Sequence, residues 1–197
     1  MGSVEDKIEK SIKSKQRGTL LFADDFNEFG SPEAVRQALQ RLKNKKVITR
    51  IAQGIYVRPQ VSEYIGEIMP SAEEVAQGIA KRDKIKIVPT GTHALNLLGL
   101  STQIPLKLVY LTDGTPREIQ IGKRSIKLKR TTSKNLMAKG KISGLAIQAL
   151  RELGQKGLTE DLELKIIELL RTEDLKALEY DILLAPVWIR KIMKQAL

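Results

Sequence analysis

The sequence predicts an α+β protein with two domains, the first at about residues 1–60 and the second at 61–197. Three observations predict this fold class. Residues 1–60 contain three helical patterns followed by a hairpin pattern. Residues 61–142 mix helical and alternating strand patterns, and the chain after Leu145 is helical throughout. A chain of 197 residues is long enough for two small domains.

The first domain begins with a predicted helix at residues 4–15, where apolar side chains recur at four-residue spacing. Acidic residues lie early in this helix and lysines late, which suits the helix dipole. A short apolar run at residues 20–22 precedes a short second helix at residues 23–29, which Gly30 ends.

A third helix is predicted from Ser31 to about Lys43. The hydroxyl of Ser31 can accept a free N–H group of the first turn, and Pro32 needs no donor at the first helical position. The apolar side chains of this helix share one face, so its Arg and Gln side chains remain on the surface.

Two strands are predicted next, at residues 47–51 and 55–57, joined by a turn in which Gly54 can take a positive φ. Helix, helix, turn, helix and hairpin is the element order of a winged helix-turn-helix. The polar stretch from Pro59 to Pro70 is predicted to be a linker.

The second domain is predicted to begin with a helix that runs from a capping box at Ser71–Glu74 to about Arg82. Strands are predicted at residues 84–88, 106–111, 117–121 and 125–128, with a helix at 91–98. Alternation in the last two strands predicts an apolar face and a basic face. Four helices are then predicted at residues 145–153, 159–171, 174–183 and 186–197.

Charge indicates the class of partner. The chain has 34 Lys and Arg residues against 23 Asp and Glu, a formal net charge of +11. Basic and acidic residues number 12 and 7 in residues 1–60, 14 and 7 in 61–142, and 8 and 9 in 143–197. The excess therefore lies in the first two stretches, which is typical of nucleic-acid binding. With only 4% aromatic residues, a stacking platform for single strands is disfavoured, so double-stranded DNA is favoured over RNA.

Composition also excludes several kinds of chemistry. The absence of cysteine excludes disulfides and thiolate sites, and a single histidine excludes a His-pair metal site within one chain. The phosphate-loop, dinucleotide and nucleophile-elbow motifs are absent. We therefore expect no catalytic residue, cofactor or metal. No apolar run approaches the length of a membrane helix and residues 1–5 carry no apolar signal-peptide core, so we expect no membrane partner and a cytoplasmic protein.

The third helix and the hairpin contain the predicted DNA contacts. Arg and Gln side chains match guanine and adenine edges in the major groove, whereas Ser31 and the lysines suit phosphates. Solvated polar surface is the alternative reading of each residue. The predicted set is Ser31, Arg36, Gln37, Gln40, Arg41, Lys43, Lys45, Lys46, Arg50, Gln53 and Arg58.

A second basic patch is predicted in the second domain, and the sequence does not choose among DNA, RNA and an acidic protein as its partner. A solvated hairpin face is the alternative. The patch consists of Lys123, Arg124, Lys127, Lys129, Arg130 and Lys134. His93 precedes an apolar helix, so a capping or packing role is favoured over catalysis on nucleotides or RNA.

Several motifs resemble the AbiEi-like antitoxins, transcriptional regulators of type IV toxin–antitoxin (abortive infection) systems. In the first domain they are Gly30-Ser31, Ala34-Val35, Gln37-Ala38-Leu39, Arg41-Leu42 and residues 49–56 (TRIAQGIY). In the second domain they are residues 89–105 (PTGTHALNLLGLSTQIP) and 110–114 (YLTDG).

The resemblance implies an N-terminal winged helix-turn-helix and a repressor that binds inverted repeats in the promoter of its own operon. It also implies a second domain that helps to counter a co-encoded nucleotidyltransferase-type toxin. The resemblance supports DNA contacts by Arg36, Gln37, Gln40, Arg41, Arg50 and Gln53. It implies no catalytic residue in this chain. The alternatives are an antitoxin that acts mainly by protein or RNA contact through the second domain, and a solitary regulator without a toxin.

Overall fold

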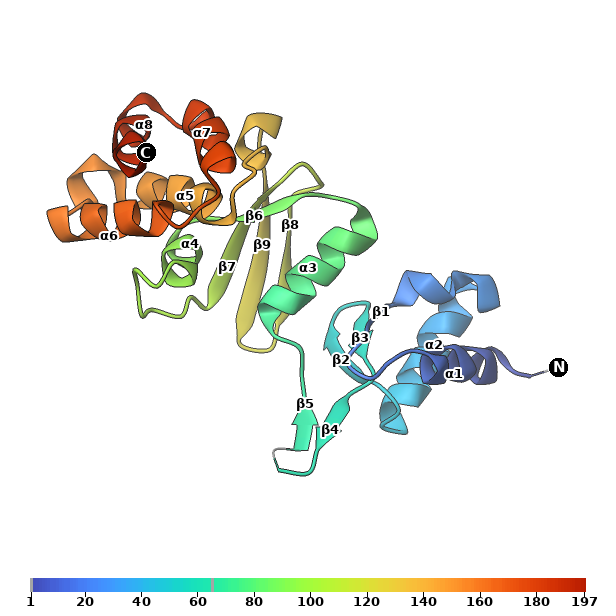
Figure 1. Ribbon diagram of the computed structural model, residues 1–197. Coiled ribbons are helices and arrows are strands. Elements are labelled where there is room, and N and C mark those ends of the chain that lie inside the picture. Colours follow the sequence, from blue (N-terminus) through green and yellow to red (C-terminus); the bar gives the residue numbers. More distant parts are fainter. Residues whose placement is uncertain (1, 65) are drawn as a thin grey trace. The chain divides into compact units, whose positions relative to one another are not determined.

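The structure is a computed structural model that describes residues 2–64 and 66–197. It is a mixed α+β protein with a helical C-terminus (Figure 1). The chain divides into two compact units. The first runs to Ile79 and includes Ile119–Arg124, and the second consists of Ala80–Glu118 and Ser125–Leu197. Over the residues that the structure describes, no helix combines the length and apolar character needed to cross a membrane.

The three predicted helices of the first unit are confirmed as α1 (Val4–Ser14), the 3-10 helix η1 (Ala23–Phe29) and α2 (Pro32–Asn44). The Ser31 hydroxyl accepts the Ala34 N–H at 3.3 Å, as the sequence predicts for the start of α2. The apolar faces of these helices form one core, with Ile8, Ile12, Phe26, Leu39 and Leu42 fully buried.

The first unit also contains a three-stranded antiparallel sheet. Its strands are β1 (Leu20–Phe22), β2 (Thr49–Ala52) and β3 (Ile55–Val57), in the order β1-β3-β2. Gly54 has φ +70° in the β2–β3 turn, as predicted. The predicted strand at residues 47–51 begins two residues late, because the Val47 N–H bonds the Leu42 carbonyl and thereby closes the end of α2.

The predicted linker between Pro59 and Pro70 is wrong in part, because most of it forms a small hairpin. Strand β4 (Gln60–Ser62) pairs antiparallel with β5 (Gly66–Ile68). Helix α3 (Ala72–Asp83) follows, and its predicted capping box is confirmed. The Glu74 N–H donates to the Ser71 hydroxyl at 3.1 Å, and the Ser71 N–H donates to the Glu74 carboxylate at 2.7 Å.

The second sheet has the order β6-β7-β9-β8. Its strands are β6 (Ile87–Pro89), β7 (Lys107–Thr112), β8 (Arg117–Ile121) and β9 (Arg124–Arg130). Strand β7 runs antiparallel to β6 and parallel to β9. The predicted strand at residues 84–88 starts late, because Lys84 takes φ +54° and the Ile85 N–H bonds the Ala80 carbonyl at the end of α3.

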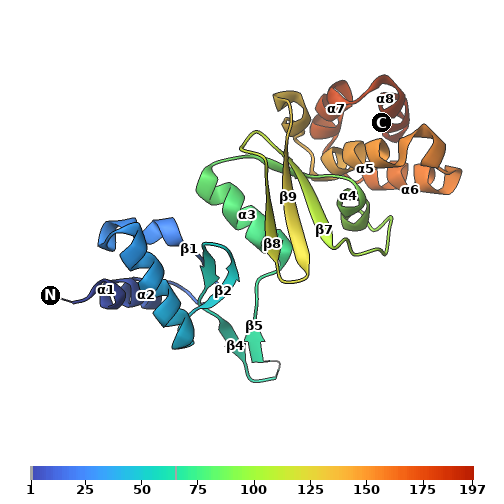
Figure 2. The same ribbon diagram turned by 180° about the vertical axis from the view of Figure 1, so that it is seen from behind.

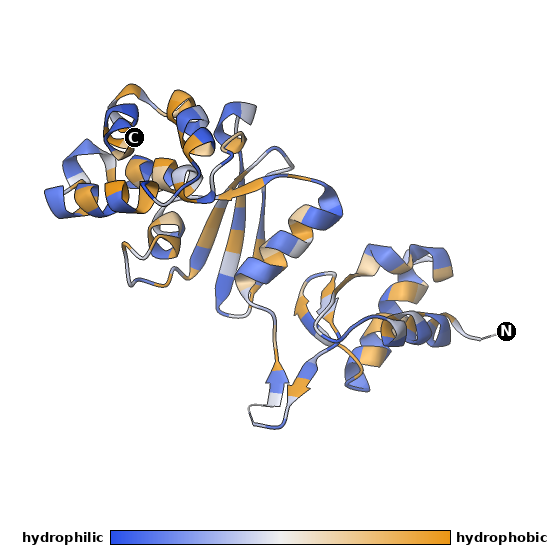
Figure 3. Ribbon diagram, in the orientation of Figure 1, coloured by the Kyte–Doolittle hydropathy of each residue, from blue (hydrophilic) through white to orange (hydrophobic). Residues whose placement is uncertain are grey.

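The remaining helices are α4 (Thr92–Leu97), α5 (Lys141–Gly157), α6 (Glu160–Leu170), α7 (Leu175–Leu184) and α8 (Val187–Met193), with short 3-10 turns at Ser133–Leu136 and Lys194–Ala196. Helix α4 lies beside α5 in both views (Figures 1 and 2). Each C-terminal helix has hydrophobic and hydrophilic residues (Figure 3), and the hydrophobic ones form a shared core that includes Leu150, Ile166 and Ile189.

Candidate nucleic-acid interface

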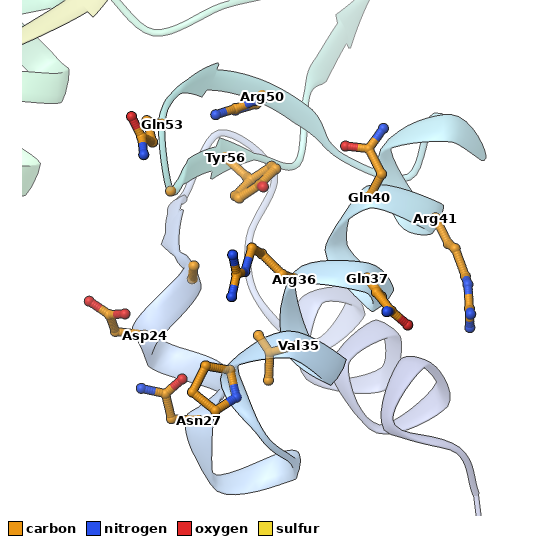
Figure 4. Close-up of a pocket in the computed structure, with 13 residues that line it drawn as sticks. Asp24, Asn27, Val35, Arg36, Gln37, Gln40, Arg41, Arg50, Gln53 and Tyr56 are labelled. Atoms are coloured by element: carbon orange, nitrogen blue, oxygen red, sulfur yellow. The ribbon is translucent and has the colours of Figure 1, made fainter.

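A groove of about 730 Å³ lies in the first unit among η1, α2 and the β2–β3 hairpin (Figure 4). Six of the predicted DNA-contacting residues line it: Arg36, Gln37, Gln40, Arg41, Arg50 and Gln53. They come from two elements that are separated in the sequence by the turn at residues 45–48. The fold therefore brings these six predicted side chains to one concave surface.

Helix α2 supplies four of the six because its apolar face is buried. Val35, Leu39 and Leu42 face the core, so the Arg and Gln side chains between them are exposed. The Arg36 guanidinium pairs with Glu33 one turn earlier at 3.0 Å. Both partners are largely exposed, so this pair leaves the guanidinium available to exchange its partner for a ligand at little cost.

The hairpin supplies Arg50 and Gln53, both exposed. The register shifts between Arg50 and Ala52, and the Arg50 Nε donates to the Ala52 carbonyl at 3.3 Å. This shift is a bulge-like irregularity, which bends a strand and re-aims its side chains. The bulged backbone thus contributes to how Arg50 is presented at the groove.

Sequence reasoning missed three polar residues of the groove: Asp24, Asn27 and Tyr56. Tyr56 is only 6% exposed, and its backbone lies opposite Arg50 in the β2–β3 ladder. Asn27 is an exposed amide on η1. The spacing of Asp24 and Asn27, three residues apart on one short helix, is the signal that could have placed them on a common side.

The other five predicted contacts lie outside the groove. Ser31 caps α2, and Lys43 and Lys46 are exposed. Arg58 donates to the carbonyls of Lys13 and Lys15 at 2.9 and 3.2 Å. Arg58 therefore satisfies carbonyls at the end of α1, which gives it a structural role in the first unit.

Lys45 and Arg41 both pair with Glu5 of α1. The Lys45 ammonium lies 2.6 Å and the Arg41 guanidinium 3.5 Å from the Glu5 carboxylate. The hydrogen bond from Lys45 holds the pKa of Glu5 below its ordinary value of 4.5, and the same contact raises the pKa of Lys45. Glu5 therefore ties α1 to the C-terminal turn of α2 and restrains one cation of the groove.

This ion pair predicts a pH dependence of stability. The pKa of Glu5 is lower in the folded chain than in the unfolded chain, so the ionised carboxylate stabilises the fold. This stabilisation is complete above pH 4.5 and is lost as the pH falls through the lowered pKa. The unfolding free energy of Glu5→Gln should therefore lie below that of the original chain at neutral pH, and this gap should close as the pH is lowered through the pKa of Glu5 in the folded chain. Urea titrations at neutral pH and at a series of acidic pH values measure this gap. Glu28→Gln, which alters an exposed carboxylate of η1, is the control and should show a smaller gap.

The second basic patch is divided by strand alternation. Lys127 and Lys129 lie on the same face of β9, whereas Arg124 and Arg130 alternate with them toward the face that buries Ile126. Lys123 is in the β8–β9 turn and Lys134 in the 3-10 turn that follows β9. The predicted apolar and basic faces of this hairpin are thus present, and only two of the six cations share the basic face.

His93 is 3% exposed in α4, and its ring packs edge-on against Tyr110 with ring centroids 5.3 Å apart. This burial and ring contact agree with the packing role predicted for His93. Aromatic pairs of this kind stabilise a core.

A family model matches residues 7–178, and its description is "Family of unknown function (DUF6088)". The matched segment extends through both units. A search of curated proteins gives no match to the chain.

Proposed function

The chain belongs to the DUF6088 family, whose function is unknown, and we propose that it is a transcriptional regulator that binds double-stranded DNA. In this proposal the first unit is a winged helix-turn-helix, with α2 as the recognition helix and the β2–β3 hairpin as the wing. One observation carries the proposal: Arg and Gln side chains of α2 and of the hairpin line the same groove.

Helix α2 has the side chains that a major-groove reader needs. It spans 13 residues, and its exposed side presents two arginines and two glutamines. An arginine fork matches the acceptors of guanine, and a glutamine amide matches the donor and acceptor of adenine. The N-terminal half of a recognition helix makes most base contacts, which favours Arg36 and Gln37 as the base readers.

The hairpin adds cationic and amide groups beside the helix. In winged proteins such groups contact the sugar-phosphate backbone next to the groove that the helix enters. Phosphate contacts give affinity and orientation without reading sequence. We assign Arg50 and Gln53 to this role, and Lys43 and Lys46 to more distant phosphates.

The resemblance to AbiEi-like antitoxins extends the proposal to a biological role. We propose that the chain represses its own operon by binding inverted repeats in the promoter. Its second unit would then help to counter a nucleotidyltransferase-type toxin encoded beside it.

The first test is binding of the full chain to a labelled fragment of its own upstream region and to a scrambled fragment of equal length. About 150 mM salt weakens nonspecific phosphate contacts, so preference becomes measurable. We expect tighter binding to the upstream fragment. Equal binding to both fragments would overturn the assignment of α2 as a sequence reader.

A further inference from the structure

A second pocket lies in the second unit and is separate from the DNA groove. Its volume is about 310 Å³. It is lined by Thr90 and Gly91 after β6, by Thr92 and His93 at the start of α4, by Pro105, by side chains of β7 and β9, and by Glu152 of α5. Pockets that bind small molecules begin at about this size and gather polar groups from several elements.

The charged side chains of this pocket include two cations and a carboxylate. Lys107 pairs with Glu118 at 2.8 Å on the exposed face of the sheet. Across residues 2–64 and 66–197, Lys129 and Glu152 have no ion-pair partner within 4.0 Å. Charges of both signs therefore line one pocket without neutralising each other.

Apart from Thr90, Thr92 and His93, the uncharged lining is apolar or made of backbone. Val109 and Leu111 alternate with buried residues of β7, are themselves half-buried, and line the pocket from the sheet. Gly91 has φ +63°, and a Cβ on it would lie 3.3 Å from the Glu152 carboxylate. Glycine therefore permits the close approach of the loop to Glu152.

We propose that this pocket binds a nucleoside monophosphate. Lys129 provides a cationic donor for a phosphate dianion. Glu152 provides acceptors for the two hydroxyls of a ribose, and Val109 and Leu111 provide an apolar surface for the base. An inorganic phosphate would use only Lys129, so the Glu152 carboxylate and the apolar surface are what favour a nucleotide.

The experiment is isothermal titration of the full chain with AMP, GMP, CMP and UMP, and with inorganic phosphate. At least one nucleotide should bind, and should bind at least about tenfold more tightly than phosphate. Lys129→Met should weaken that nucleotide about tenfold or more, because a charged hydrogen bond is lost. Glu152→Gln should weaken it while leaving the affinity for phosphate unchanged or higher.

Lys127→Met is the matched control, because Lys127 lies two residues earlier on the same face of β9 and does not line the pocket. Because Lys127 is not part of the lining, this variant should weaken nucleotide binding less than Lys129→Met does. The proposal is overturned if no nucleotide binds, if phosphate binds as tightly as the nucleotides, or if Lys127→Met weakens binding as much as Lys129→Met. None of these outcomes depends on DNA binding. Failure of the nucleotide proposal can therefore be distinguished from failure of the proposed DNA contact.

Discussion

Replacing Arg36 and Arg41 together with alanine is expected to remove the preference of the full chain for its upstream DNA. Both side chains line the groove from α2. The bidentate base contact proposed for Arg36 contributes about 1–3 kcal/mol, and Arg41 adds a second cation to the same groove. Binding of the double variant to the upstream fragment should fall to the level of the scrambled fragment.

The structure indicates that this variant remains folded. Arg36 pairs with Glu33 and Arg41 with Glu5, and both arginines are more than 60% exposed. Exposed pairs of this kind contribute about 1 kcal/mol or less. Circular dichroism and urea unfolding check the fold.

Lys7→Ala/Lys10→Ala is the matched control for this double variant. It removes the same charge from the exposed surface of α1, outside the groove. This control should weaken binding to both DNA fragments alike, because it changes only the general electrostatic attraction. If the two double variants lose preference equally, the groove does not read sequence.

Replacing Asp181 with alanine is expected to cause a large loss of stability in the second unit. Asp181 of α7 is 0% exposed. Its carboxylate accepts the Lys139 N–H at 2.8 Å, the Gly140 N–H at 2.9 Å and the Ser143 hydroxyl at 2.5 Å. Alanine removes this acceptor at the start of α5 and leaves the buried Gly140 N–H without it, whereas the Ser143 hydroxyl keeps a longer contact with Glu173 at 3.4 Å. A buried donor left unsatisfied costs about 1–3 kcal/mol, so the unfolding free energy should fall by about 2–4 kcal/mol when the other lost hydrogen bonds are added.

Urea unfolding followed by circular dichroism measures this loss. Glu179→Ala is the control, because it removes an exposed carboxylate of the same helix and should change the unfolding free energy by less than about 0.5 kcal/mol. A loss below about 1 kcal/mol for Asp181→Ala would show that the carboxylate does not hold α5 to α7.

Much of the fold could be predicted from local patterns. The start of α2 follows from Ser31 and Pro32, and the start of α3 from Ser71 and Glu74, because capping depends on side chains within one turn. The exposure of the α2 Arg and Gln side chains follows from apolar spacing. The four Arg and Gln side chains that α2 gives to the groove could be predicted for the same reason, whereas Asp24, Asn27 and Tyr56 and the shape of the groove could not.

The structure differs from the sequence-based predictions where segments that are distant in the chain pair with each other. Leu20–Phe22 reads only as a short apolar run, and it becomes a strand because it pairs with Ile55–Val57, more than 30 residues later. The stretch from Pro59 to Pro70 lacks a strong strand pattern, and backbone pairing alone makes it a hairpin. The pairing partners of these short strands cannot be identified from the local sequence, because three residues contain too little hydrophobic pattern to specify a partner strand.

The sequence by itself determined the helices, their caps, the basic surface of α2 and the α+β class, since these depend on neighbours within one or two turns. Only the tertiary structure decided which cations gather. It placed Arg50 and Gln53 beside α2, tied Lys45 to Glu5 and used Arg58 to cap α1. It also brought Lys107, Lys129 and Glu152 to one pocket. Such groupings depend on strand register and helix packing over long separations, and charge counting along the chain contains no information about either.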